Sequence, residues 1–289
     1  MKIVAMLGVK DEVELIRPCI DHLRSIGVDL IVACDSGSAD GTRDLLDACG
    51  PSDDLQIVDL DLPHDQKRAK KLALARDAQA DWVMFLDADE FWLPRDGALK
   101  SCRGLADADV LVVERFNVPP TPQGPPIGAH LSPAGYDQLL LCIQKIPAFH
   151  ATWTRHLDVP WLLGADILPK VLARTDVIRA VNAGGHTVEP SRGALQQVRA
   201  RDLLIAHVPF STFPRFERKV ANIRNRLCTH PEFFADNTAW HWQRWASLSE
   251  AGRLREEFER QLLDEGQIAR LRETGVIGTA AAWFAQSRD

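Results

Sequence analysis

The sequence predicts an α/β fold built on a mostly parallel sheet flanked by helices. From residue 2 to residue 87, short apolar runs rich in β-prone residues alternate with segments whose apolar residues recur at helical spacing. Polar clusters follow three of the apolar runs, at residues 10–12, 35–42 and 87–90. Because ligands bind beyond the carboxyl ends of parallel strands, these clusters predict a single site at one edge of the sheet.

Strands and helices are expected to alternate regularly in the first third of the chain. Gly27 stands where the first helix would end, and Asp40 or Thr42 could cap the second helix. The third helix is rich in alanine and long basic side chains. The expected strands are 2–9, 28–35, 55–62 and 81–87, and the expected helices are 12–27, 43–50 and 65–80.

After residue 87 the sequence has a different composition and predicts a different set of elements. A fifth strand is expected at 108–118, and a long surface loop at 119–128, because proline lacks a backbone donor and fixes its own φ. Residues 169–175 and 177–188 are expected to be late strands of the same sheet. From about Phe213 the pattern is helical. We therefore expect a catalytic domain over 1–212 and a helical C-terminal extension over 213–289 packed on it.

Composition narrows the class of protein. The chain has 289 residues, of which 46% are hydrophobic and 26% charged, as in an ordinary globular protein. A net charge of -6 argues against a general nucleic-acid binder. The six cysteines lack CxxC spacing, the opening residues lack a signal-peptide pattern, and no apolar run approaches the ~20 residues of a membrane span. We expect a cytoplasmic protein with reduced thiols.

The acidic cluster after the fourth strand suggests a metal site. Asp87 and Asp89 are two residues apart in a turn, so their carboxylates can converge and would repel each other. Mg²⁺ or Mn²⁺ would relieve that conflict, since both favour carboxylate and phosphate oxygens. A solvated acidic turn is the alternative. Basic residues that could meet phosphates, or could simply be surface charge, are Lys67, Arg68, Lys70, Lys71, Arg215, Arg218 and Lys219.

The cluster at the second strand end suggests a nucleotide. Asp35 could accept hydrogen bonds from a base or ribose, and Gly37 and Gly41 allow the backbone to approach a ligand closely. The chain has neither the GxGxxG pattern of dinucleotide binders nor the GxxxxGK[ST] phosphate loop. Dehydrogenases and phosphate-loop kinases are therefore disfavoured.

The ordered set of motifs resembles family 2-type glycosyltransferases. Residues 9–42 resemble their opening strand and helix with the turn D-x-G-S-x-D-G-T, and residues 81–92 resemble their DxD segment in its "DADEF" form. A "PKV", a "GGH" and the segment "HVPFSTFPRFERK" follow in the order of that subgroup, so the likeness runs from Ile3 to about Leu227. It implies a GT-A fold, a UDP- or GDP-linked sugar donor, and Mn²⁺ or Mg²⁺.

The resemblance also implies roles for single residues. Asp35 would hold the base, Asp87 would lie near the ribose, and Asp89 would ligate the metal. His207 would complete the metal or diphosphate site, with His186 as a rival. The metal ligands expected in this way are Asp87, Asp89 and His207, and the further donor-binding residues are Lys10, Glu12, Ser38, Lys71, Ala88, Arg215 and Lys219.

The general base is not identified by the sequence. Enzymes of this type invert the anomeric centre with a carboxylate that takes the acceptor's proton. The usual "ED" motif is missing, and Asp158, Asp166 and Glu189 lie in the corresponding region as open alternatives. The arginine-serine that often follows the late histidine is replaced by Phe210–Ser211.

The acceptor and two competing functions also stay open. Trp240, Trp242 and Trp245 could stack on a sugar, anchor a helix at a membrane surface, or pack it on the core. The acceptor could be a saccharide, a lipid-linked sugar or a protein, and polysaccharide assembly is one expected setting. A nucleotidyltransferase is disfavoured because no glycine-rich basic segment follows the first strand. A non-catalytic sugar- or protein-binding relative is the third hypothesis.

Overall fold

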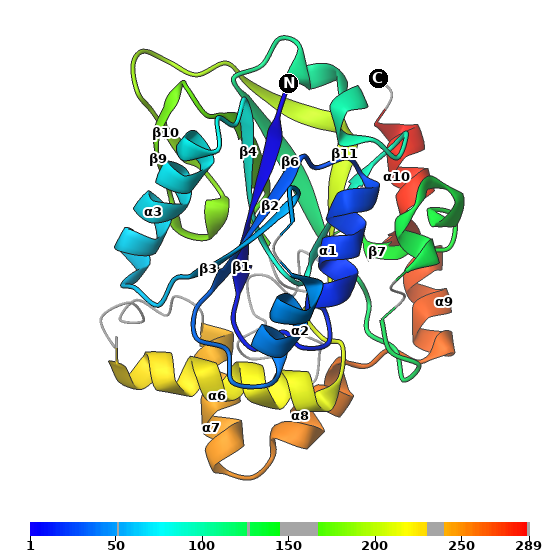
Figure 1. Ribbon diagram of the computed structural model, residues 1–289. Helices are drawn as coiled ribbons and strands as arrows, with labels where there is room; N and C mark the ends of the chain where they lie inside the picture. The colour runs from blue at the N-terminus through cyan, green and yellow to red at the C-terminus, as the bar shows by residue number, and fades with distance from the viewer. Residues whose placement is uncertain (51, 126–127, 145–166, 230–239, 288–289) are drawn as a thin grey trace.

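An eight-stranded sheet forms the centre of the molecule (Figure 1). The computed structural model describes all residues except 51, 126–127, 145–166, 230–239 and 288–289. The strand order is β3-β2-β1-β4-β8-β6-β11-β5, with helices on both faces and one helix, α6, lying across the ends of the strands (Figure 1). The predicted α/β class with a mostly parallel sheet is confirmed.

The first four strands are parallel neighbours, as expected. Their side chains are apolar on both faces because both faces are covered. Alternate residues of β1 pack against α1 and α2 on one face, and the intervening residues pack against α3 on the other. The bounds are β1 Ile3–Val9, α1 Ile16–Ser25, β2 Leu30–Asp35, α2 Thr42–Cys49, β3 Leu55–Asp59, α3 His64–Asp77 and β4 Trp82–Asp87.

The other half of the sheet is mixed. Strand β8 (Lys170–Arg174) runs antiparallel between β4 and β6 (Val110–Asn117). Strand β11 (Gln197–His207) is parallel to β6 and antiparallel to β5 (Glu90–Pro94) at the sheet edge. The sequence analysis missed β5 and β11. Only two residues separate β4 from β5, and a chain that short spans roughly 10 Å, so the sheet must curl to bring their ends together.

The two late segments, both expected in the central sheet, lie in different sheets. The first, β8, does join it, but β9 (Ile178–Val181) and β10 (Val188–Pro190) pair with each other in a two-stranded antiparallel sheet. The expectation that they extend the central sheet was wrong. Gly184 and Gly185 have φ of 70° and 68°, which turns the chain back so that β10 meets β9.

The C-terminal region is mostly helical, but it also supplies a strand. Strand β12 (Ile277–Thr279) pairs antiparallel with β7 (Leu140–Cys142). The division of the chain at residue 212 stays a prediction. The helices are α6 Phe213–Thr229, α7 Trp240–Glu250, α8 Leu254–Gln261, α9 Glu265–Glu273 and α10 Ala280–Gln286, and the short 3-10 turns are Leu99–Ser101, Arg103–Leu105, Ala129–Leu131, Pro133–Gly135 and Ala183–Gly185.

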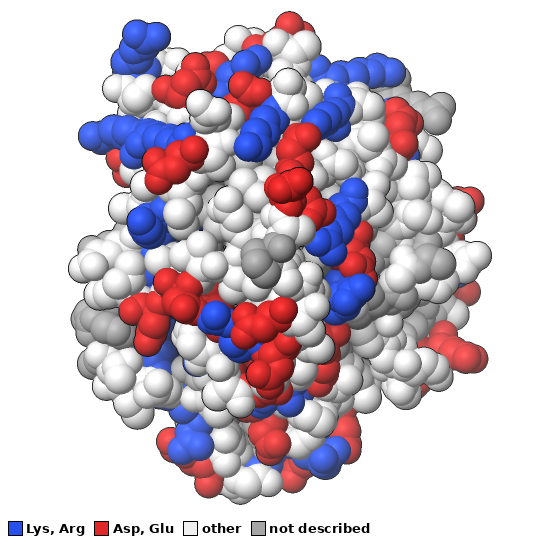
Figure 2. All heavy atoms as spheres, in the orientation of Figure 1, with Lys and Arg blue, Asp and Glu red and all other residues white. Residues whose placement is uncertain are grey.

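An aromatic cluster joins α6, α7 and α8. Trp245 is 3% exposed and meets Phe216 edge-to-face, with ring centroids 5.1 Å apart. Core packing is therefore the role of this tryptophan, as the third of the three expected alternatives proposed. Within the described residues, no helix combines the length and the apolar character that a membrane crossing requires. Acidic and basic side chains are interspersed on the face in Figure 2.

We predict that Gly185→Ala lowers the stability of the fold more than Gly193→Ala does. Both glycines have positive φ, so each alanine adds roughly 1 kcal/mol of backbone strain. At Gly185 the new Cβ would also stand 2.7 Å from Phe85 Cβ on β4, whereas it meets nothing within 4 Å at Gly193. Urea unfolding of both variants measures the difference, and equal losses would mean that the contact with β4 is unimportant.

Candidate functional site

The carboxyl ends of several strands meet at one edge of the sheet. In the strand register, Val9 lies opposite Asp35, Gly8 opposite Asp87, and Asn117 opposite His207. Each of these three pairs stands at or beside the last residue of its strands. Parallel pairing therefore brings together side chains that are up to about 200 positions apart in the chain.

Asp35 is buried at the end of β2. Its side chain is 3% exposed, and its Oδ1 accepts hydrogen bonds from Ser38 N at 3.0 Å and Ser38 Oγ at 2.6 Å. Lys10 Nζ donates to Gly37 O, and Lys67 Nζ donates to Ser36 Oγ at 3.0 Å. Two basic side chains thus approach the turn after β2 from β1 and from α3.

Gly8 lets two charged groups approach the backbone of β1 closely. A Cβ at this position would lie 3.0 Å from Lys71 Nζ and 3.1 Å from Asp87 Oδ1. The Asp87 side chain is 59% exposed, so it stays accessible to a ligand. The expected donor-binding residues Lys71 and Asp87 are therefore side by side over the backbone of β1.

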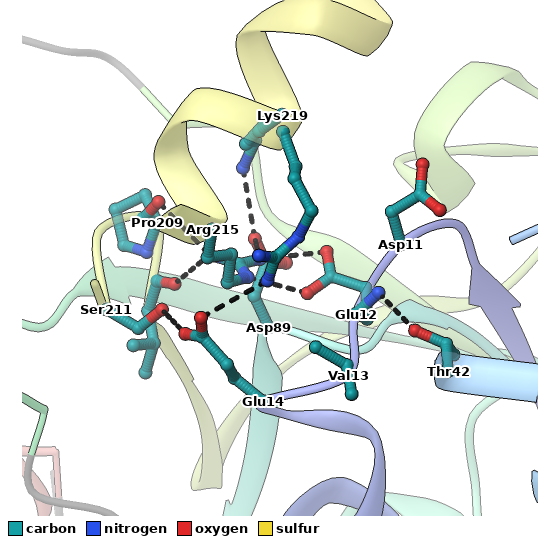
Figure 3. Close-up of polar contacts among 12 residues, drawn as sticks. Asp11, Glu12, Val13, Glu14, Thr42, Asp89, Pro209, Ser211, Arg215 and Lys219 are labelled. Carbon is teal, nitrogen blue, oxygen red and sulfur yellow. Dashed lines mark hydrogen bonds and ion pairs between the residues drawn. The ribbon is translucent and has the colours of Figure 1, made fainter. Parts of the chain in front are cut away.

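Asp89 is the centre of a buried ion network (Figure 3). Its Oδ2 accepts hydrogen bonds from Arg215 Nη2 at 2.9 Å and from Lys219 Nζ at 3.1 Å. Burial alone would raise the pKa of Asp89, but Lys219, His207 and Arg215 together outweigh it and hold that pKa well below its usual value. Asp89 therefore remains ionised inside the protein.

Arg215 links Asp89 to the loop after β1. The guanidinium is 1% exposed and donates to both carboxylate oxygens of Glu12, from Nε at 2.6 Å and Nη2 at 2.8 Å. Its Nη1 donates to Val208 O and Pro209 O, both at 3.3 Å. Burial opposes its charge, yet Glu12 and Asp89 raise the pKa of Arg215 above its usual value. Glu12 and Arg215 were both expected to contact the donor. In the structure, their ion pair ties α6 to the loop after β1.

Further contacts fix α6 over the same loop. Glu14 accepts hydrogen bonds from Ser211 Oγ at 3.1 Å and Arg218 Nη2 at 3.2 Å, and Asn222 Nδ2 donates to Asp11 Oδ2 at 2.7 Å. The sequence analysis did not assign these partners. The signal was present as acids within 11–14 and polar residues at 215, 218, 219 and 222, which recur at helical spacing.

His207 faces Asp89 with an unprotonated nitrogen. Its Nδ1 lies 2.7 Å from Asn117 Oδ1, which makes Nδ1 the protonated nitrogen. Burial lowers the pKa of His207, although Asp89 opposes the shift, so the ring is neutral. Nε2 then carries a lone pair and stands 3.7 Å from Asp89 Oδ2.

A divalent cation fits between these two groups. A carboxylate oxygen and a neutral imidazole nitrogen are both acceptors, and a metal ion is the partner they can share, with Asn117 holding the ring by its other nitrogen. Among the described residues, no three His, Cys, Asp or Glu side chains gather closely enough to hold a metal alone. Phosphate and water oxygens would have to complete the coordination.

His186 has a different setting. Its Nδ1 lies 2.7 Å from Pro169 O, and burial lowers its pKa to about 4. His207 is thus the histidine that faces the Asp89 carboxylate.

A second buried ion network neutralises Asp87. Lys170, which the sequence analysis overlooked, lies 2.9 Å from Glu90 Oε2 and 3.2 Å from Asp87 Oδ2. Arg115 Nη1 donates to Glu90 Oε1 at 2.6 Å. Burial opposes the charge of Lys170, but Asp87 and Glu90 raise its pKa. The protein's own cations thus relieve the repulsion between Asp87 and Asp89, so crowding alone does not require a metal. The feature that favours one is His207 Nε2, which faces Asp89.

The three base candidates are not assembled by the described structure. Asp158 and Asp166 lie outside the described residues. Glu189 lies on β10, where it pairs with Arg179 Nη2 at 3.0 Å and is 41% exposed. Ala88, expected among the donor-binding residues, is fully buried and stands between the two aspartates in the chain.

Comparison with known proteins identifies the N-terminal part of the chain. Residues 7–124 match the model of glycosyl transferase family 2. This part is a family 2-like glycosyltransferase domain. It contains Asp35, Lys71, Asp87 and Asp89, whereas His207, Arg215 and Lys219 follow it in the chain. The match confirms the family predicted from the motifs, and the GT-A type of fold expected with it.

Solved structures give distant likenesses to the chain. S. aureus TarS is 14% identical with a TM-score of 0.40, over 88% of this chain and 43% of TarS. A Pyrobaculum calidifontis mannosyltransferase in complex with GDP-Man and Mn²⁺ is 15% identical with a TM-score of 0.41, over 99% of this chain and 79% of that one. A Mycobacterium tuberculosis glucosyl-3-phosphoglycerate synthase is 18% identical with a TM-score of 0.35, over 78% of this chain and 79% of that one. Among curated proteins, no sequence matches.

We predict that Arg215→Met strongly destabilises the folded chain. Removing one partner of a buried ion pair costs about 3–5 kcal/mol, because Glu12 and Asp89 would keep their burial without their main cation. Adding Glu12→Gln should recover part of that loss, since one of the two orphaned charges disappears. Urea unfolding of wild type, single and double variants measures both effects. A single variant as stable as wild type would contradict the role assigned to Arg215.

Proposed function

We propose that the chain transfers a sugar from a nucleotide-diphosphate donor to an acceptor, with a divalent metal and with inversion at the anomeric carbon. The family match supports the reaction class. A metal is included because the neutral Nε2 of His207 faces Asp89 Oδ2 at 3.7 Å. The strand ends proposed to bind the nucleotide lie beside this pair.

The nucleoside half of the donor would bind at the ends of β1 and β2. Asp35 would accept hydrogen bonds from the base, and Ser38 would donate to it. Gly37, whose φ is positive, lies in the same turn. Asp87 would accept from the ribose hydroxyls over Gly8, with Lys71 beside it. Lys10 would reach the same pocket from the end of β1.

The diphosphate would bind near Asp89, His207 and Lys219. When bound, Mn²⁺ or Mg²⁺ would neutralise the departing diphosphate. Asp89 and His207 would hold that ion, and Lys219 would add a positive charge on the same side. A carboxylate must accept the acceptor's proton as its hydroxyl attacks. Asp158, Asp166 and Glu189 stay the candidates for that base, and a saccharide, a lipid-linked sugar or a protein would be the acceptor.

We predict metal-dependent binding of UDP or GDP that requires Asp89. Isothermal titration should give tighter binding of one of the two nucleotides in Mn²⁺ than in EDTA. In Asp89→Asn the gain from Mn²⁺ and the transfer of sugar should both fall by on the order of 100-fold or more. Asp59→Asn is a control, because Asp59 ends the outer strand β3, is exposed and pairs with Arg43.

If neither nucleotide binds better with Mn²⁺, the proposed metal dependence is wrong. If nucleotides bind but sugar hydrolysis and transfer never occur, the chain is a binding relative rather than an enzyme.

We predict that Asp35→Asn weakens nucleotide binding both with and without metal. Asp35 would contact the base, whereas Asp89 would act through the ion, so the loss in Asp35→Asn should be similar in Mn²⁺ and in EDTA. Loss of a hydrogen bond to a charged group predicts roughly a tenfold or larger decrease in affinity. A loss seen in Mn²⁺ alone would mean that Asp35 belongs to the metal site instead.

A further inference from the structure

Lys219 and the proposed metal compete for the same carboxylate oxygen. Asp89 Oδ2 accepts from Lys219 Nζ at 3.1 Å and from Arg215 Nη2 at 2.9 Å. It is also the oxygen that His207 Nε2 faces at 3.7 Å. An ion shared by His207 and Asp89 would therefore meet an oxygen that already has two cationic donors (Figure 3).

Of the two donors, Lys219 is the one that can leave. Arg215 is 1% exposed and held by Glu12 and two backbone carbonyls in addition to Asp89. The Lys219 side chain is 30% exposed, and its ammonium is a point charge on a flexible stem. Rotating that stem breaks the pair with Asp89 and leaves the anchor of α6 in place.

Resting on the function proposed above, we propose that Lys219 is a positioning residue that neutralises Asp89 in the free protein and passes to the diphosphate when the metal takes its place. In the free protein, a metal ion that binds Asp89 must displace the Lys219 ammonium. The displaced ammonium then stays close to the doubly charged ion. With the diphosphate present, the displaced ammonium gains an anionic partner. Metal and nucleotide therefore bind as a pair, and each is bound weakly alone.

The test measures Mn²⁺ binding directly rather than activity. Mn²⁺ affinity of wild type and Lys219→Met is determined by electron paramagnetic resonance of free Mn²⁺, without nucleotide and with saturating UDP or GDP. Without nucleotide, Lys219→Met should bind Mn²⁺ at least about tenfold more tightly, because a positive charge beside the ion is gone. The nucleotide should then improve Mn²⁺ affinity by a smaller factor than in wild type.

Arg218→Met is the matched control. It removes one positive charge from the neighbouring position of α6, but Arg218 pairs with Glu14 and Asp40 instead of Asp89. Its Mn²⁺ affinity and its coupling to the nucleotide should stay within about twofold of wild type, because the charge of Arg218 is compensated by carboxylates other than Asp89. Lys219→Gln, which keeps a polar side chain, serves if Lys219→Met is poorly folded.

The outcomes separate this inference from the proposed function. Equal Mn²⁺ affinity of wild type and both Lys219 variants, with metal-dependent nucleotide binding intact, would overturn the role of Lys219 while leaving the function. The same gain in Arg218→Met would also overturn it, since general charge would then explain the effect. Absence of any Mn²⁺–nucleotide coupling in wild type would instead refute the function on which the inference rests.

Discussion

The site depends on one buried guanidinium. Arg215 lies between Glu12, after the first strand, and Asp89, after the fourth; Arg215 and Asp89 are buried, and Glu12 is largely buried. Each charge would be strongly unfavourable alone in this setting, and together they are tolerated because the geometry gives each one direct partners. The pairing fixes where α6 lies, and α6 carries Lys219 to the carboxylate. The same ion network thus determines both the local fold and the position of the groups proposed to meet the donor.

The two aspartates of the acidic turn have different electrostatic surroundings. Asp87 is neutralised by buried Lys170 and lies beside Lys71, yet its side chain stays open to solvent. Asp89 is buried among Arg215, Lys219 and a neutral His207. In the proposed function, Asp87 would accept hydrogen bonds from the donor, and Asp89 would share an ion with His207. Two residues of the same type, two positions apart, reach different roles through burial and partners.

The sequence predicted well what local pattern determines. The parallel strands from β1 to β4 and their helices follow from apolar periodicity, and the strand ends follow from the polar clusters after them. β11 was missed because Arg201 and Asp202 interrupt its apolar pattern, at the place where its register with β6 shifts, and β5 because its acidic and aromatic residues suggested a turn. Lys170 was overlooked because a lysine inside an apolar run does not show which acids it pairs with. Its partners, Asp87 and Glu90, lie about 80 positions earlier in the chain. The bonds of Glu12 and Glu14 to α6 leave a partial signal, acids within 11–14 and polar residues at helical spacing in α6, but which of them pair depends on a contact about 200 positions away in the chain.

The attachment of α6 has a consequence for any attempt to isolate the nucleotide-binding half by itself. A fragment cut at residue 212 would retain Glu12, Glu14 and Asp89 but would lose the arginines and the lysine that compensate them. Such a fragment would expose the strand ends and carry an uncompensated cluster of acids, and it should misfold or aggregate. The smallest unit that can be expressed independently therefore extends at least through the end of this helix at Thr229.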